Sequence, residues 1–62
     1  MARPLAASEA RRRDVFRLLV VAQDMQMSVE QSRVMVSEQY GLDEDRIRLI
    51  EQEGLAGQWP PL

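Results

Sequence analysis

The sequence predicts an all-α domain of three short helices, and three observations support this fold class. Apolar residues recur at helical spacing between residues 8 and 25 and again after residue 43. A residue suited to the N-cap position precedes each periodic stretch. Two adjacent prolines near the end of the chain exclude further helix there. We therefore predict helices over about residues 8–25, 28–40 and 43–53, followed by an extended, proline-containing tail.

Length and composition exclude several classes of function. The chain has 62 residues, contains neither cysteine nor histidine, and carries a net charge of −2. A chain of this length forms one domain at most and buries only ~60% of its unfolded surface, so it is marginally stable by itself. The commonest catalytic base, metal ligands and strong nucleophile are missing. We therefore expect no enzymatic activity, no metal site and no cofactor.

The chain divides into an arm, a domain and a tail. We expect a flexible arm over residues 1–7, a three-helix domain over 8–55 and the extended tail over 56–62. The longest apolar stretch, residues 18–22, is far shorter than the ~20 residues that span a bilayer. No targeting segment is visible. We therefore expect a cytoplasmic protein with no membrane association.

The first two helices have recognisable beginnings and wide apolar faces. Ser8 is a candidate N-cap of the first helix, and Ser28 with Gln31 forms a candidate capping box for the second. The β-branched residues within VFRLLVVA also allow an edge strand, but length and polar flanks favour helix. The apolar positions of these two helices are Val15, Phe16, Leu18, Leu19, Val20, Ala22, Met25, Val29, Val34, Met35, Val36 and Tyr40.

The second and third predicted helices meet at a corner. Ser37, Gly41 and Ile47 have the spacing of a helix-turn-helix, in which a small residue, a turn glycine and an inward apolar residue let two helices cross closely. Asp43 is the candidate N-cap of the third helix. Gly54 is a candidate C-terminal stop, with Leu55 folding back over it. The same pattern also fits an αα-corner that serves only packing.

The stretch GLDEDRIRLIEQEGL resembles the last helix-turn-helix of bacterial sigma factors, region four, which reads the −35 promoter element. The resemblance covers about residues 37–55. It rests on Leu42, Asp43, Arg46-Ile47-Arg48, Ile50-Glu51 and Gly54-Leu55. Two positions depart from the family, because Glu44 stands where the housekeeping sigma has a basic DNA contact and Leu49 where it has a polar base contact.

The resemblance implies a transcription-associated module that binds DNA or RNA polymerase. On this reading the third helix faces the major groove, and Asp45 orders arginine side chains or accepts a hydrogen bond from a cytosine amine. The arginines near the start of the chain would contact backbone phosphates. The candidate DNA-binding residues are Asp45, Arg46, Arg48, Gln52, Arg11, Arg12 and Arg13.

A helical protein-interaction or oligomerisation module without nucleic-acid binding is the competing hypothesis. The negative net charge, Glu44 and Leu49 favour it. The apolar positions exceed what a tiny bundle can bury, so we expect a homo-oligomer. Trp59 packs back on the bundle with Leu62, or forms a docking tag for a partner groove. The candidate protein-interaction residues are Phe16, Val20, Met35 and Trp59.

Overall fold

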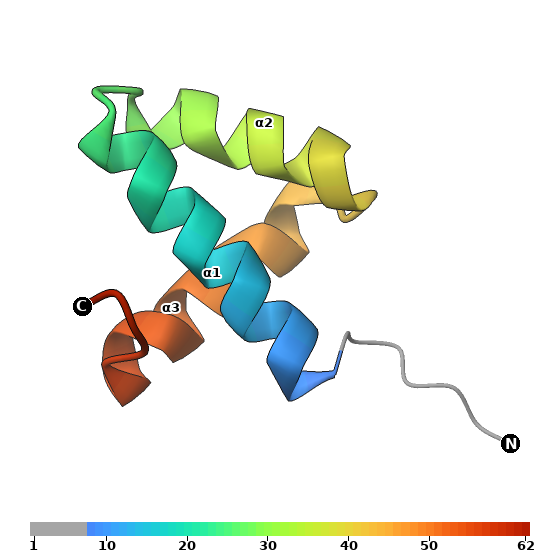
Figure 1. The fold of residues 1–62 in the computed structure, drawn as a ribbon. Helices are drawn as coiled ribbons and strands as arrows, with labels where there is room; N and C mark the ends of the chain where they lie inside the picture. The colour runs from blue at the N-terminus through green and yellow to red at the C-terminus, as the bar shows by residue number, and fades with distance from the viewer. Residues whose placement is uncertain (1–7) are drawn as a thin grey trace, which may run out of the picture.

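Three α-helices make up most of the described part of the chain (Figure 1). The structure is a computed structural model that describes residues 8–62. Helix α1 spans Glu9–Asp24, α2 spans Val29–Tyr40 and α3 spans Glu44–Gly57. Residues 8–62 contain no strand, so the all-α prediction is confirmed. The predicted flexible arm, residues 1–7, lies outside the described residues.

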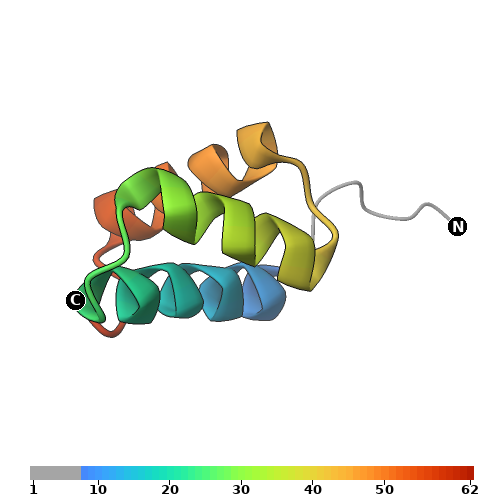
Figure 2. The same ribbon diagram turned by 90° about the horizontal axis from the view of Figure 1, so that it is seen from above.

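Every pair of helices is in contact. Figure 1 shows α3 passing behind α1, and Figure 2 shows α3 on the opposite side of the molecule from α1. Helix α2 closes the arrangement by contacting both. One face of α3 therefore points away from the other two helices.

All three predicted N-caps are confirmed. Ser8 and Asp43 each accept a hydrogen bond from the backbone N–H three residues later, at 3.2 and 2.8 Å. Ser28 does the same at 3.0 Å, and the Gln31 side chain accepts the Ser28 backbone N–H in return. These bonds satisfy amide protons that the first turn of a helix leaves without partners. The helix starts are thus encoded locally.

The corner between α2 and α3 forms at the predicted glycine. Gly41 has φ +67° and ψ +31°, a left-handed conformation that glycine adopts without strain. The backbone N–H groups of Gly41 and Leu42 donate to the carbonyl of Ser37. The Ser37 hydroxyl donates to the carbonyl of Leu42. Serine at this small-residue position therefore binds the turn directly, which alanine could not do.

The core lies where the three helices face one another. Its members come from α1, α2, α3 and the C-terminal segment, and they are Val15, Phe16, Leu19, Val36, Ile47, Ile50 and Trp59. One polar residue, Ser32, is fully buried beside them. Its hydroxyl donates to the Val29 carbonyl at 2.7 Å and accepts from the Gln23 side chain at 3.0 Å. A buried hydroxyl with both partners satisfied ties α2 to α1 without a desolvation penalty.

The predicted stop at Gly54 is wrong. Helix α3 continues to Gly57, and Gln58 is its left-handed C-cap at φ +51°. Gly54 is buried because the Phe16 ring lies directly against it, and a Cβ at Gly54 would overlap that ring. The glycine thus serves close approach of α1 to α3 and not helix termination. Leu55 does not fold back and is 55% exposed.

The C-terminal segment also differs from prediction. Its first two residues belong to α3, and the remainder turns back on the bundle instead of extending. Trp59 donates its backbone N–H to the Gly54 carbonyl at 2.9 Å, and its ring meets Phe16 edge-on, with centroids 6.0 Å apart. The Leu62 N–H donates to the Trp59 carbonyl at 3.0 Å, closing a turn. Trp59 caps the core as one reading predicted, whereas Leu62 stays 59% exposed.

Phe16 and Trp59, both predicted to contact partners, lie in the core of the domain. Phe16 is 1% exposed and Trp59 is 7% exposed, because each ring covers the other and Gly54 makes room for both. Aromatic rings at a helix crossing contribute large buried areas to a core that has few other members. Neither side chain is available to a partner while the domain is folded.

Gly41→Val should destabilise the domain by about 1–3 kcal/mol, because a β-branched residue resists positive φ. No atom lies within 4 Å of a Cβ built at Gly41, so the cost comes from the backbone and not from a clash. Gly41→Asn should cost less, since asparagine tolerates the left-handed region. Urea unfolding measures both. Equal stability of the Val and Asn variants would contradict the argument.

Gly54→Ala should also destabilise the domain, although alanine favours helix by about 1 kcal/mol. Overlap with the Phe16 ring should cost about 1–3 kcal/mol and outweigh that gain. In a Phe16→Leu background the smaller side chain leaves room, so the same Gly54→Ala change should become neutral or stabilising. Unfolding of the four proteins of this cycle gives the coupling. Additive effects would show that the close approach does not constrain the fold.

Candidate nucleic-acid interface

The face of α3 that points away from the core collects most of the predicted base-contacting residues. Ile47, Ile50 and Gly54 are buried and define the inward side of the helix. Helical spacing places the opposite positions on the free side. We call this set the outward face of α3; its exposed members are Asp45, Arg48, Leu49 and Gln52.

Two charges of the outward face are paired loosely. An Arg48 Nη donates to an Asp45 carboxylate oxygen at 3.3 Å, one turn earlier on the same helix. The two side chains are 57% and 86% exposed, so the pair is weak and the guanidinium remains accessible. Asp45 thus lies where it can orient Arg48, as the sequence suggested. Together with Arg33 of α2, the outward face lines a shallow surface hollow.

A salt bridge that sequence reasoning missed links α3 to α2 beside this face. Two N–H groups of Arg33 donate to one carboxylate oxygen of Glu51, at 2.8 and 3.0 Å. Both side chains are largely covered, at 28% and 15% exposure. Arg33 lies one turn before Ser37, and Glu51 one turn after Ile47. A pair of opposite charges flanking the corner at equal spacing is the signal that could have revealed the bridge.

Arg46 does not lie on the outward face. It is two residues from Arg48, which is more than half a helical turn apart, and it is half-buried on the flank of α3. The structure therefore separates the two arginines that the sequence pattern grouped together. Arg48 remains as the arginine of α3 on the outward face.

The arginines of α1 take part in contacts within the domain. Arg11 donates to the Tyr40 carbonyl at 3.2 Å, and its guanidinium lies 5.1 Å from the centre of the Tyr40 ring. Helix α2 has no basic residue in its last turn. Arg11 therefore brings a positive charge to the negative end of the α2 dipole from a neighbouring helix.

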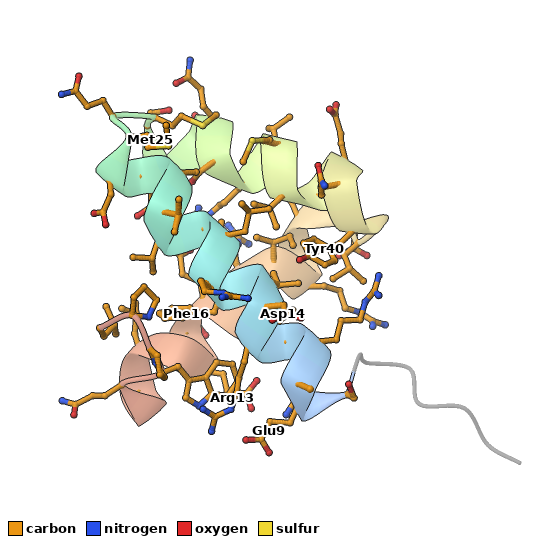
Figure 3. The ribbon with its side chains drawn as sticks, in the orientation of Figure 1. Glu9, Arg13, Asp14, Phe16, Met25 and Tyr40 are labelled. Carbon is orange, nitrogen blue, oxygen red and sulfur yellow. The ribbon has the colours of Figure 1, made fainter. Side chains whose placement is uncertain are left out.

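Arg12 contacts α3, and Arg13 contacts the C-terminal segment. Arg12 binds both carboxylate oxygens of Glu53, at 2.8 and 3.0 Å. This hydrogen bond lowers the pKa of Glu53 and raises that of Arg12, despite partial desolvation of both groups. Arg13 pairs with Glu9 at 2.9 Å and stacks over Trp59, its guanidinium 4.8 Å from the ring. Figure 3 shows Arg13 pointing from α1 toward the C-terminal segment.

A second surface is apolar. Val20 and Met35, both predicted to contact partners, are half-buried against the core. Met35 also lines an open groove on α2 and the turn before it, and the other lining residues are Met27, Ser28, Glu30, Gln31 and Val34. Met25, two residues before Met27, is 74% exposed. Figure 3 places it at the α1–α2 turn, far from Arg13. We call this surface the methionine groove.

Within residues 8–62, no group of three or more acidic, histidine or cysteine side chains could hold a metal ion. None of the helices in the described range is long and apolar enough to cross a bilayer.

Comparisons do not assign the chain to a family. No protein-family model, curated protein or solved structure matches the chain. Inference about function therefore rests on the geometry of the two surfaces.

The Arg12–Glu53 pair should make stability depend on pH. Because the pKa of Glu53 is lowered from 4.5 in the folded state, its stabilising effect is complete above that value and is lost as the pH falls through the folded pKa. Glu53→Gln should therefore lower the melting temperature at pH 7, and the difference should disappear in acid. Glu38→Gln, which removes one exposed negative charge from α2, is the control for net charge. A deficit of Glu53→Gln that persists in acid would contradict this account.

Proposed function

We propose that this chain is a small helix-turn-helix module of transcription that binds duplex DNA through the outward face of α3. The observation that carries the proposal is the corner at Gly41, which leaves Asp45, Arg48 and Gln52 exposed together on one side of the second helix of the motif. In helix-turn-helix proteins this second helix enters the major groove. The resemblance of residues 37–55 to sigma region four supports the same reading.

Each residue of the outward face has a role that its chemistry fits. Arg48 donates to the O6 and N7 atoms of guanine, and Gln52 binds the N6 and N7 atoms of adenine. Asp45 orients Arg48 or accepts from a cytosine amine. Arg46, on the flank of α3, would contact a backbone phosphate. Such a module works in the cytoplasm, the compartment in which sigma factors act.

The electrostatics of the chain set the expected strength of binding. The net charge of −2 provides little phosphate neutralisation. Arg11, Arg12 and Arg13, the predicted phosphate contacts, already bind Tyr40, Glu53 and Glu9. We therefore propose modest affinity with a shallow salt dependence, in which base contacts carry a larger share than usual. RNA polymerase, or a second copy of the chain, would then raise occupancy on DNA.

The second candidate function is a protein-interaction or self-association module. The methionine groove favours it, because Met27, Val34 and Met35 place apolar side chains in an open groove beside polar ones. Methionine adapts to irregular partner surfaces. On this reading the corner at Gly41 serves only packing, and the domain forms a homo-oligomer or docks on a polymerase element.

Arg48→Ala should weaken specific DNA binding by about 1–3 kcal/mol and leave the fold intact. The matched control is Arg17→Ala, because Arg17 is also an exposed arginine paired with an aspartate three residues earlier, at 3.2 Å, but on α1. Fluorescence anisotropy with random and −35-like duplexes at ~50 and ~200 mM salt measures both effects. Equal losses for the two variants would remove the special role of Arg48. No binding by the wild type would favour the interaction module.

A further inference from the structure

Leu49 is an apolar residue on the otherwise polar outward face. Its side chain is 63% exposed, and it takes no part in the core. Asp45 lies one turn before it, and Gln52 nearly one turn after it. The residues that line the surface hollow on this face are Arg33, Asp45, Arg48, Leu49 and Gln52, so leucine is the single apolar group among polar ones.

Leu49 lies outside the buried side of α3. Ile47, Ile50 and Gly54 form that buried side, whereas Leu49 is exposed. A partner that covers Leu49 together with Arg48 and Gln52 would fit best if it offered one apolar group among hydrogen-bonding groups.

The major groove of DNA has one such group. Base edges there present hydrogen-bond donors and acceptors, apart from the C5-methyl group of thymine. We propose that Leu49 contacts this methyl group, so that the module selects duplexes with a thymine beside the bases that Arg48 and Gln52 contact. This inference rests on the proposed DNA-binding function and names the sequence class that the same face recognises.

Replacing thymine by uracil tests the inference, because uracil lacks only the methyl group and keeps every hydrogen-bonding atom. The probe is the tightest duplex selected from a random thymine-containing pool, resynthesised with uracil in place of every thymine. Loss of one buried methyl contact should weaken binding by the 62-residue chain roughly fourfold. Anisotropy titration of both duplexes gives the ratio.

Two variants assign the effect to one side chain. Leu49→Ala should bind the two duplexes equally. Leu55→Ala, which removes another exposed leucine of α3, should retain the roughly fourfold preference of the wild type. Circular dichroism and thermal melting confirm that both variants are folded.

The possible outcomes distinguish the role of Leu49 from DNA binding itself. Wild-type protein that binds both duplexes equally would overturn the role of Leu49 while DNA binding stands. A thymine preference that survives in Leu49→Ala would overturn it as well, since another group would then contact the methyl. Absence of binding to any selected duplex would remove the proposed function, and the inference with it.

Discussion

The contact of Phe16 with Gly54 determines how the rest of the structure is arranged. A bundle of three short helices has few core residues, so the position of each helix depends on a small number of close contacts. The glycine allows the aromatic ring of α1 to lie against the backbone of α3, and Trp59 then covers the ring from the C-terminal side. This crossing fixes which side of α3 is buried. The outward face is exposed as a direct consequence.

Charged contacts complete the arrangement at the helix ends and flanks. Arg33 links α2 to α3 through Glu51, and Arg12 links α1 to α3 through Glu53. Arg11 reaches from α1 to the end of α2. Each long arginine thus connects a different pair of helices, and its aliphatic part covers apolar surface as well. Arg11 and Arg12, which the sequence suggested for phosphate binding, thus help to hold together a domain that has no cysteine to form a disulfide.

Local signals in the sequence predicted the fold well, and non-local contacts explain where prediction failed. Ser8, Ser28 and Asp43 act within one turn of themselves, so their capping role can be recognised without knowing the fold. Gly41 likewise serves a turn that its neighbours define. The predicted role of Gly54 is wrong because a glycine can either end a helix or allow close approach of a neighbouring helix. Which role applies depends here on Phe16, 38 residues away in the chain.

The same distinction applies to the candidate site. Helical spacing alone brought Asp45, Arg48 and Gln52 together, because all three lie on one helix. It could not show that Arg46 lies on a flank, since the direction of the core was needed to divide the helix into faces. The bridge from Arg33 to Glu51 likewise depends on how α2 crosses α3.

Trp59 is the only tryptophan in the chain, and its surroundings make it a natural optical probe. The indole lies between the Phe16 ring and the Arg13 guanidinium, where α1, the end of α3 and the C-terminal turn meet. Its emission therefore reports the joint assembly of all three segments through a single signal. The indole is buried in the core, and Trp59 is not a residue of the outward face. Ligands bound to the outward face should therefore leave the emission spectrum nearly unchanged. Trp59 emission can thus follow the folding of this small domain without interference from ligands on the outward face.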